Sequence, residues 1–459
     1  MTKSEMNDFK LLIKNKYVQI LDFFIKNPNN SFYVNEILKK VKISPSVLCD
    51  GLKELESIGV LKSEKRANAI YYSLKKEHMI LDALKPYADP DYQKRESHAV
   101  DAIKKAIPAF LKRDMLPDSK GFFAELYRND EVFPKHYLAT AADGVGTKLI
   151  LAEAMEKFDT VGTDLVAMNV NDLACFGKVN PFMFLNYIAC QAEIQEKGIT
   201  GDIIKGMVKG LEQCDASDIL MNNIHINLGK GETASVDELI SATKPGKGFD
   251  VAATMVGFVE RDCYDKRLII KPGFKVIALR SSGCHSNGYT DIRLNLLNGD
   301  FETRPEFKRR YRGRFSLHDK FGNTTIGQEL LKPTRIYLRT INAISKEFSV
   351  LGFNNTGYGL KNLNRAKEKV EFRITEPLKP QPIFELLQKE SGYSDEEMYR
   401  KFNMGQGFFL VCRPEDAEGV IKIAKKFGDE AKVVGEARKS DVTKVVLEKD
   451  GKEIEFIGY

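Results

Sequence analysis

The turn that follows the strand-like run 136–142 combines residue types that bind phosphate groups. It reads DGVGTK, from Asp143 to Lys148. Gly144 and Gly146 have no side chain to keep a ligand away from the backbone, and a helix that begins after the turn offers N–H groups to an anion. Lys148 adds a positive charge, and Asp143 supplies the hard oxygen ligand that Mg²⁺ prefers. The pattern predicts a magnesium and phosphate site, with an ordinary turn as the alternative.

A second polar segment, DLVAMNVND, lies on a predicted helix over residues 164–172. One helical face carries residues at i, i+4, i+7 and i+8, namely Asp164, Met168, Asn171 and Asp172. The helix is otherwise apolar, and buried carboxylates need partners. Because eight residues span about 12 Å of helix, the two carboxylates are too far apart to bind one ion. They are expected to bind separate ions or separate parts of a polyphosphate chain.

Two further loops consist of small residues with a few polar side chains, and each follows an apolar run. They are residues 229–233 (GKGET) and 281–289 (SSGCHSNGY). Loops of this kind on a rigid scaffold often bind ligands. His285 lies between the glycines of the second loop, which makes it the best candidate for chemistry among the six histidines. A structural histidine is the alternative.

The elements that must position these residues are strands alternating with helices. Strand-like runs cover residues 137–142, 182–189, 251–259 and 274–279. Their alternation with helical stretches predicts an α/β (α+β) body. At 459 residues the chain is too long for one ordinary domain. A boundary after the third run divides the body into a first domain, 96–262, and a second domain, 266–459.

A separate unit is expected over residues 1–88. Helical patterns at 18–25, 34–41 and 44–59 precede two strand-like runs at 60–63 and 69–74. This order resembles the winged helix-turn-helix family of the ArsR/MarR type, in which the third helix enters the DNA major groove and the wing touches phosphates. The resemblance implies DNA contacts by four cationic residues: Lys53, Lys62, Lys65 and Arg66.

The charge balance of this unit leaves its partner open. Residues 1–90 contain 15 Lys and Arg against 11 Asp and Glu, and DNA-binding surfaces usually carry denser basic clusters. Winged helices also serve in dimerisation or protein docking. DNA binding and protein binding are therefore both retained.

Composition limits the remaining classes. A net charge of +6 argues against a protein that coats nucleic acid. The seven cysteines are scattered without C-x-x-C, so neither a disulfide framework nor a zinc site is predicted. The N-terminus lacks the apolar region of a signal peptide, and no apolar run approaches the ~20 residues that span a bilayer. A cytoplasmic protein without a membrane partner is expected.

Six motifs occur in one order along the chain from about residue 98 to the end: DGVGTK, GTDLVAMNVNDL, GKGETA, SSGCHSNGY, LKPTRIY and MYRKFNMGQG. In order and approximate spacing they resemble aminoimidazole ribonucleotide (AIR) synthetase, the phosphoribosylformylglycinamidine cyclo-ligase family. That family closes the imidazole ring of a purine precursor. ATP activates the formyl amide oxygen, a ring nitrogen attacks, and ADP and phosphate leave. The superfamily also contains enzymes that use ATP on other substrates.

The resemblance implies ATP and Mg²⁺ as cofactors, a ribonucleotide substrate, and a homodimer of two-domain subunits preceded here by the winged helix-turn-helix module. Metal ligands would be Asp143 and Asp172. Catalytic residues would be Asp143, Lys148, Glu232 and His285. The nucleotide and substrate would be bound by Gly144, Gly146, Thr147, Asp164, Asn171, Asn287, Thr334, Arg335, Thr356 and Asn403.

Several departures from the family pattern fall at functional places. The glycine-rich segment before the first motif is reduced to residues 119–125 with one glycine, and FLDY reads FLNY, with Asn186. In the segment that the family writes AHLTGGG, the histidine is replaced by Asn354 and one glycine by Tyr358. Asparagine cannot transfer a proton as histidine does. A basic loop, residues 308–314, is either a phosphate or nucleic-acid contact or a solvated loop.

Three hypotheses follow. The first is an ATP- and Mg²⁺-dependent cyclo-ligase of purine synthesis, or a close paralogue. The second is a superfamily enzyme that acts on another amide or phosphate acceptor. The third is a transcription regulator whose enzyme-like body senses a nucleotide while the winged helix binds DNA. The retained Asp143, Lys148 and Asp172 favour an ATP site, whereas Asn354 favours the second and third hypotheses over the first.

Overall fold

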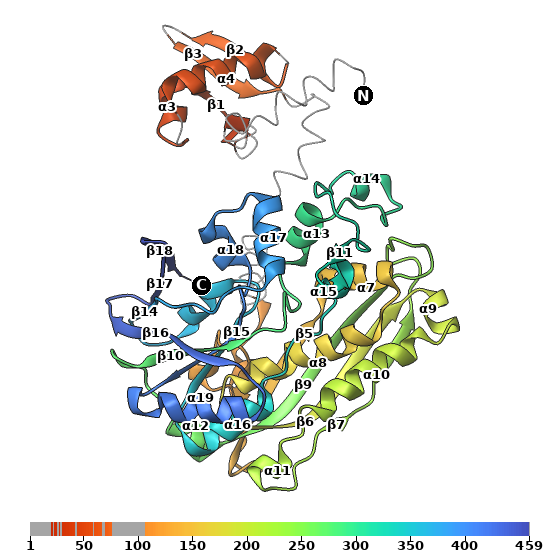
Figure 1. The fold of residues 1–459 in the computed structure, drawn as a ribbon, viewed down its shortest axis with the longest axis vertical. Coiled ribbons are helices and arrows are strands. Elements are labelled where there is room, and N and C mark those ends of the chain that lie inside the picture. Colours follow the sequence, from red (N-terminus) through yellow and green to blue (C-terminus); the bar gives the residue numbers. More distant parts are fainter. Residues whose placement is uncertain are drawn as a thin grey trace. The chain divides into compact units, whose positions relative to one another are not determined.

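The computed structural model describes residues 106–458 and residues 20–75, the latter without 22, 25–26, 28–29, 42–43, 58 and 67–68. The chain divides into two compact units, Met1–Leu111 and Lys112–Tyr459 (Figure 1). The boundary expected between residues 88 and 96 lies outside the described residues, so its place stays a prediction.

The first unit combines helices with a small sheet. Its elements are β1 (Ser31–Tyr33), α3 (Val34–Leu38), α4 (Pro45–Ser57), β2 (Leu61–Arg66) and β3 (Ala69–Leu74), and the strands lie in the order β1-β3-β2. Ile20, Phe24, Leu48, Leu52 and Leu55 are buried together in its core. The predicted second and third helices and both strands are confirmed, whereas β1 was not expected. The winged helix-turn-helix assignment itself stays a prediction.

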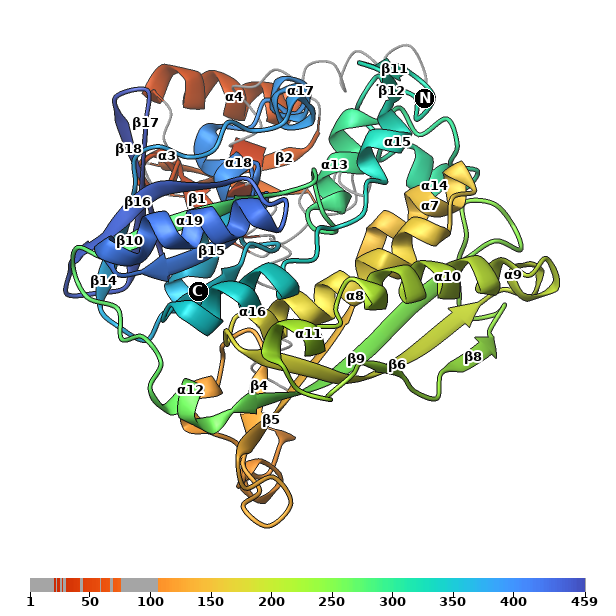
Figure 2. The ribbon, with the colours of Figure 1, turned by 60° about the horizontal axis from the view of Figure 1, so that its bottom comes forward.

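The first half of the second unit is built on a mixed sheet with the strand order β4-β5-β9-β6-β7, and β8 also pairs with β6. The strands are β4 (Glu125–Tyr127), β5 (His136–Gly144), β6 (Val179–Cys190), β7 (Asn227–Leu228), β8 (Glu232–Ser235) and β9 (Phe249–Glu260). Along β9 buried residues alternate with more exposed ones, as expected for a sheet covered on one face. The long helices α8 (Asp159–Ala174) and α10 (Ile199–Glu212) cover that face (Figure 2).

Helices α8 and α10 pack with their backbones in close contact. A Cβ atom added to Gly206 would lie 1.8 Å from the Asp159 carbonyl oxygen, and one added to Gly162 would lie 2.1 Å from the Ile203 carbonyl oxygen. Only glycine fits at such a distance. The close packing fixes α8, whose polar residues form much of the site described below.

The second half of the second unit contains a seven-stranded sheet with the order β13-β15-β10-β16-β14-β17-β18. The strands are β10 (Lys275–Arg280), β13 (Leu351–Asn354), β14 (Val370–Ile374), β15 (Gln406–Cys412), β16 (Ala431–Lys439), β17 (Lys444–Lys449) and β18 (Lys452–Ile457). β15 is buried along its whole length, because it is a central strand with helices packed near it. The four predicted strand-like runs correspond to β5, β6, β9 and β10 and are confirmed.

Helices and short turns complete the second unit. The helices are α7 (Leu149–Met155), α9 (Ala192–Glu196), α11 (Ser217–Leu220), α12 (Arg261–Asp265), α13 (Tyr289–Leu296), α14 (Pro305–Lys308), α15 (Ile326–Leu330), α16 (Leu338–Glu347), α17 (Pro382–Ser391), α18 (Asp395–Lys401) and α19 (Ala417–Lys426). Two short strands, β11 (Lys320–Phe321) and β12 (Thr324–Thr325), form a separate pair. The expected boundary at 262–266 falls on α12.

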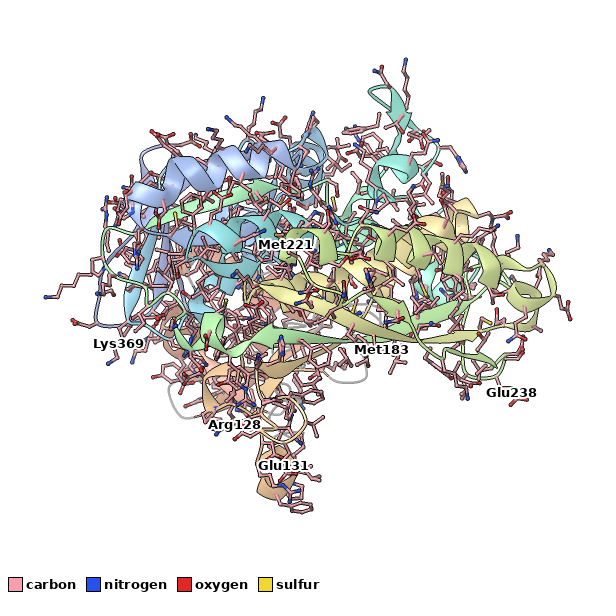
Figure 3. The ribbon with its side chains drawn as sticks, turned by 90° about the horizontal axis from the view of Figure 1, so that it is seen from below. Arg128, Glu131, Met183, Met221, Glu238 and Lys369 are labelled. Atoms are coloured by element: carbon pink, nitrogen blue, oxygen red, sulfur yellow. The ribbon has the colours of Figure 1, made fainter. Side chains whose placement is uncertain are left out.

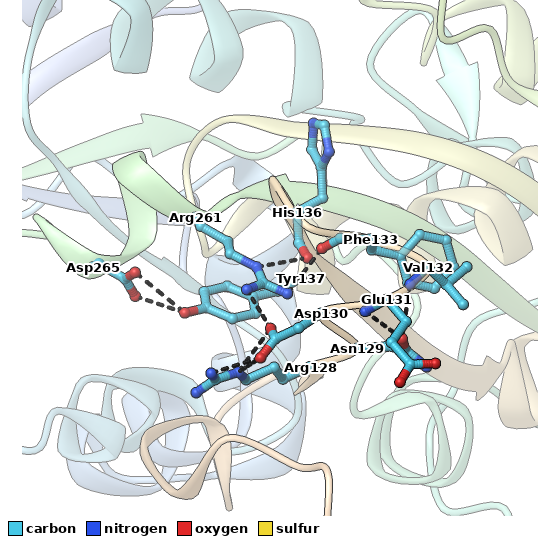
Figure 4. A network of polar contacts seen from close by, with 10 residues as sticks. All are labelled: Arg128, Asn129, Asp130, Glu131, Val132, Phe133, His136, Tyr137, Arg261 and Asp265. Carbon is cyan, nitrogen blue, oxygen red and sulfur yellow. Dashed lines mark hydrogen bonds and ion pairs between the residues drawn. The ribbon is translucent and has the colours of Figure 1, made fainter.

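The connection between β4 and β5 projects from the sheet, with Arg128 and Glu131 on it (Figure 3). The guanidinium of Arg261 holds it by donating to the carbonyl oxygens of His136 (3.1 Å) and Phe133 (2.8 Å) and to the carboxylate of Asp130 (2.5 Å) (Figure 4). The projecting loop is therefore anchored by Arg261, the first residue of α12. It positions the start of β5, whose other end carries the DGVGTK turn.

All seven cysteines are unpaired thiols. Among the helices of the described part of the chain, none has the length and apolar character to cross a bilayer.

Candidate functional site

Asp143 lies near the end of β5, on the sheet face that packs against α8. It follows the buried residues Tyr137, Ala139 and Ala141 at intervals of two, so its side chain projects to their side. The backbone N–H of Gly144 donates to Asp143 Oδ1 at 2.8 Å. Gly146 has φ of 72°, which a glycine adopts without strain. The exposed carboxylate and open turn are those expected from the sequence.

Asp172 of α8 approaches Asp143 from the helix above the sheet. The side-chain amide of Asn354, at the end of β13, donates to Asp172 Oδ1 at 2.8 Å. Burial raises the pKa of Asp172 to about 7; the hydrogen bond from Asn354 opposes this shift, and repulsion by the Asp143 carboxylate adds to it. Two carboxylates from different elements therefore lie near one another, and each disfavours the charge of the other.

Asn169 lies one helical turn before Asp172 and is fully buried. Its side-chain N–H₂ donates to the carbonyl oxygen of Leu165 (2.9 Å) and to that of Asp143 (3.4 Å). Its Oδ1 atom is buried without a hydrogen-bond partner. No role was predicted for this residue from the sequence. Its i, i+3 spacing from Asp172 was the signal that could have identified it.

Lys148 and Asp164 form an ion pair from which solvent is excluded. The Lys148 ammonium lies 2.9 Å from Asp164 Oδ1 and 2.8 Å from Oδ2, and it also donates to the carbonyl oxygens of His285 (2.9 Å) and Lys332 (2.7 Å). Asp164 Oδ1 accepts from Thr334 through both its N–H and its hydroxyl, each at 2.7 Å. An ammonium has three protons, and all are used within the protein.

The roles expected for Lys148, Asp164 and Thr334 as ligands of the nucleotide are therefore not met in this conformation. None of the three exposes more than 4% of its surface, and their polar groups bind one another. They join α8 and the DGVGTK turn to the two loops of the second half, which contain His285 and Thr334.

His285 is a buried, neutral side chain in the present structure. Burial, together with weaker repulsion from Lys148 and Arg335, lowers the pKa of His285 to about 3. Its Nε2 accepts from the backbone N–H of Ser282 at 3.2 Å, and its backbone has φ of 58°. A histidine that stays neutral at physiological pH cannot deliver a proton as an acid. The buried position of His285 thus favours a role in holding the loop over a catalytic role.

Three more predicted ligands are held by contacts within the protein. Asn171 bonds the backbone of Arg335 (2.8 Å) and Tyr337 (3.0 Å). The Arg335 side chain pairs with the buried carboxylate of Asp429. Asn403 donates to the carbonyl oxygen of Gly283 at 2.9 Å and accepts from the N–H of Gly405 at 2.9 Å. These residues connect segments of the site, and contacts with a ligand stay a prediction for them.

The remaining predicted residues lie at the loops around this centre. The hydroxyls of Thr147 and Thr290 are 3.3 Å apart, and Thr356 donates to Asn362 Oδ1 at 3.2 Å. A Cβ atom on Gly357 would lie 3.5 Å from Asn287 Oδ1, so the loops that contain Asn287 and Thr356 adjoin. The structure brings these loops near the DGVGTK turn through Thr147.

Glu232 is separated from this group within the sheet. Strand register aligns it with Tyr187 of β6, then Ala252 of β9, then Gly144 of β5. Three strand spacings correspond to about 14 Å. Glu232 is exposed and lies in the same row across the strands as Gly144, next to Asp143. A contact of Glu232 with a ligand stays a prediction.

Two of the departures from the family pattern have a structural account. The carbonyl oxygens of Lys120 and Phe122, in the segment with one glycine, accept from Lys367 (2.7 Å) and Arg365 (2.8 Å). That segment is therefore bound to the second half of the unit. Asn186 is aligned through Ala253 with Asp143 and is largely buried, and a Cβ atom on Gly231 would lie 2.8 Å from its amide.

Comparison with known families matches both halves of the second unit. Residues 128–259 match the N-terminal domain of AIR synthase related protein, and residues 271–448 match its C-terminal domain. The match contains every residue assigned to the site. The resemblance inferred from the six motifs is confirmed at the level of the family.

Relatives cover most of the same region. The chain is 34% identical over 345 residues to a protein of Methanocaldococcus jannaschii named phosphoribosylformylglycinamidine cyclo-ligase, covering 74% of this chain and 89% of that protein. A Methanosarcina barkeri protein of the same name is 38% identical over 314 residues, covering 68% and 82%.

Similar solved structures include a HypE–HypF complex, with a TM-score of 0.44, 15% identity, and coverage of 74% of this chain and 93% of that one. T. maritima PurL in complex with ATP has a TM-score of 0.44 at 12% identity, with coverage of 83% and 54%. At these values neither structure bears on function. On its two matched domains and its relatives, this chain belongs to the AIR synthase related family.

Proposed function

We propose that the protein catalyses the ATP- and Mg²⁺-dependent closure of the imidazole ring, converting formylglycinamidine ribonucleotide to aminoimidazole ribonucleotide in purine biosynthesis. The observation that carries this proposal is the approach of Asp143 and Asp172, from different elements, beside an open glycine turn. Relatives that bear the cyclo-ligase name, 34% to 38% identical to this chain, support the choice of reaction.

The residues present fit a magnesium ion. Mg²⁺ takes oxygen ligands and is usually bound in proteins by one or two carboxylates together with substrate phosphates. Asp143 and Asp172 supply two carboxylates. Burial, and to a smaller extent repulsion by Asp143, raises the pKa of Asp172, and a bound cation would favour its charged form. Such an ion would neutralise charge on the phosphates of ATP.

The reaction needs positioning and charge neutralisation more than proton transfer by the protein. The amide oxygen of the substrate takes the γ-phosphoryl group and ADP is released. The ring nitrogen then forms the new C–N bond, the C–O bond breaks, and phosphate leaves with one proton lost from nitrogen. Gly144 and Gly146 allow phosphates to approach the backbone. Lys148 and Asp164 hold the surrounding loops, and a neutral His285 orients the Ser282 N–H.

A homodimer is part of the proposal. The face of the first sheet away from α8 and α10 carries exposed apolar side chains from β6: Phe182 (36%), Leu185 (39%) and Tyr187 (42%). Rings of Phe182, Phe258 and Phe133 stack in series on this face, at 5.5 Å and 5.2 Å between centroids. A contiguous apolar patch of this kind is typical of an interface.

Regulation through DNA is a second candidate function for the first unit. All four cationic residues singled out there, Lys53 on α4 and Lys62, Lys65 and Arg66 on β2, are exposed. Arg66 is paired with Glu64 at 2.7 Å, which weakens its contribution. This candidate is compatible with catalysis by the second unit.

The decisive experiment incubates the full chain with ATP, Mg²⁺ and formylglycinamidine ribonucleotide and follows ADP and aminoimidazole ribonucleotide together. Equal amounts of both products are expected. An Asp143→Ala variant should form neither, while Asp300→Ala, a change at an exposed carboxylate outside the site, should behave as the natural chain. ADP without the imidazole would indicate another acceptor. Nucleotide binding without turnover of any kind would indicate a sensor and exclude the cyclo-ligase.

A further inference from the structure

The side-chain oxygen of Asn169 is a buried acceptor without a hydrogen-bond partner among the described residues. Asn169 is 0% exposed, and its Oδ1 makes no hydrogen bond. An unsatisfied buried polar atom costs about 1–3 kcal/mol. Two other buried side chains of α8 do have partners: Asp164 pairs with Lys148 and accepts from Thr334, and both amide atoms of Asn171 bond the second half of the unit.

The orientation of this amide is fixed by its other end. The N–H₂ group of Asn169 has two carbonyl acceptors, on Leu165 and Asp143. Exchanging the nitrogen and oxygen would place an oxygen against two oxygens, so the assignment of Oδ1 as the free atom follows from the hydrogen bonds. The free oxygen therefore belongs to a side chain that touches the backbone of Asp143.

Asn169 is also close to the second carboxylate. Residues three apart on a helix have Cβ atoms about 5–6 Å from one another, which is the relation of Asn169 to Asp172. Asp172 Oδ1 is occupied by Asn354. The site thus combines two carboxylates and one unengaged amide oxygen, and all three groups are of the type that binds Mg²⁺. In the part of the chain that the structure describes, no donor bonds the amide oxygen, whereas a cation would satisfy it.

We propose that the side-chain oxygen of Asn169 is a further ligand of the divalent cation held by Asp143 and Asp172. This inference rests on the magnesium site of the proposed function and adds a third protein ligand to it. A neutral ligand suits this place, because two carboxylates already balance a divalent charge and the phosphates of a nucleotide bring more negative charge.

The test measures binding of Mn²⁺, as an oxygen-bound substitute for Mg²⁺, to the full chain by the loss of the free-ion electron paramagnetic resonance signal. Asn169→Ala should weaken Mn²⁺ binding about tenfold or more. Asn169→Asp keeps an oxygen at the same place and should therefore bind Mn²⁺ more tightly than Asn169→Ala does. A purely structural amide predicts the reverse, since Asp lacks the N–H₂ donor and adds charge beside Asp143.

Asn342→Ala is the matched control. Asn342 is another fully buried asparagine, and both ends of its amide bond Val179 of the first half. Its loss should lower the unfolding temperature without changing Mn²⁺ affinity. If Asp143→Ala loses Mn²⁺ but Asn169→Ala does not, the inference about Asn169 is overturned and the proposed magnesium site stands. If the natural chain itself binds no Mn²⁺, both fail.

Discussion

The ammonium group of Lys148 lies 2.8–2.9 Å from both carboxylate oxygens of Asp164, and neither side chain reaches solvent. The pair joins two parts of the enzyme, because Lys148 also binds carbonyl oxygens of the loops at His285 and Lys332. A buried ion pair contributes little net stability relative to apolar residues, but breaking it leaves an uncompensated charge. The pair instead holds the DGVGTK turn in a fixed position relative to the second half of the unit.

The first prediction concerns this pair. Lys148→Met should lower the free energy of unfolding of the second unit by about 3–5 kcal/mol, because Asp164 is left charged and unpaired in a buried place. The double variant Lys148→Met, Asp164→Leu should recover much of that loss. Urea unfolding followed by far-ultraviolet circular dichroism measures both effects.

Lys197→Ala provides the control for that experiment. Lys197 pairs with Glu193 on the surface, where side-chain exposure is 56% and 29%. Exposed pairs contribute about 0–1 kcal/mol, so the unfolding midpoint should hardly move. Equal losses for Lys148→Met and Lys197→Ala would contradict the role assigned to the buried pair.

The location of the site was predictable from local sequence. The DGVGTK turn follows a strand and the DLVAMNVND segment forms a helix, as their glycine content and apolar spacing indicated. These are properties of neighbouring residues. That Asp143 and Asp172 approach one another was implied only by the resemblance to the family, since local patterns do not show which elements meet.

The partners of the polar residues were not predictable, because they come from distant parts of the chain. Lys148 was expected to meet phosphate, yet two of its three acceptors lie 137 and 184 residues away. Helical spacing placed Asp164, Asn171 and Asp172 on one face. Since α8 is enclosed by a sheet and by the second half, that face meets several neighbours: Thr334 contacts Asp164, and Asn354 contacts Asp172.

The second prediction is a pH dependence of stability. The pKa of His285 is lowered to about 3 in the folded protein, from about 6.5 in an unfolded chain. Below pH 6.5 the unfolded state therefore binds one more proton, and stability falls toward pH 3 by up to about 1.4 kcal/mol per pH unit from this residue. His285→Asn, which tolerates the positive φ, should remove that part of the slope between pH 6.5 and 4.5.

Unfolding midpoints in urea at a series of pH values measure this slope, and only the slopes are compared, because the substitution itself can change stability at every pH. His318→Asn, at an exposed histidine, is the matched control and should leave the slope unchanged. An identical slope for His285→Asn and the natural chain would refute a buried neutral histidine.

The third prediction concerns Asn354, where the family pattern has histidine. Its amide orients Asp172 at 2.8 Å, and residues that orient a metal ligand typically change affinity 10–100-fold when removed. Asn354→Ala should raise the Mg²⁺ concentration for half-maximal ATP turnover by about tenfold. Asn354→His should keep the Mg²⁺ requirement close to that of the natural chain, because an imidazole N–H can also donate to the carboxylate. Asn364→Ala, which loses bonds to Phe456 and Gly458, should leave the Mg²⁺ requirement unchanged.

The fourth prediction separates DNA binding from protein binding in the first unit. If the exposed Lys62 and Lys65 contact phosphates, the double alanine variant should bind mixed-sequence duplex DNA more weakly. The slope of log K against log salt concentration should also decrease in magnitude by about 1–2. Arg66→Ala should have a smaller effect, since Arg66 is paired with Glu64. Lys39→Ala, outside α4 and β2, is the control. If the natural chain does not bind DNA, the DNA-binding role of the first unit is excluded and protein binding is the role that stays open.

The fifth prediction concerns the exposed face of the first sheet. Leu185→Glu places a charge in the apolar patch at a residue with 39% exposure, and burying that charge between two subunits would cost several kcal/mol. The variant should sediment as a monomer at concentrations where the natural chain is a dimer. Val208→Glu has matched exposure, 41%, but lies on α10 on the other side of the sheet, and it should remain dimeric. If the natural chain sediments as a monomer, or if both variants stay dimeric, the apolar face is not the dimer interface.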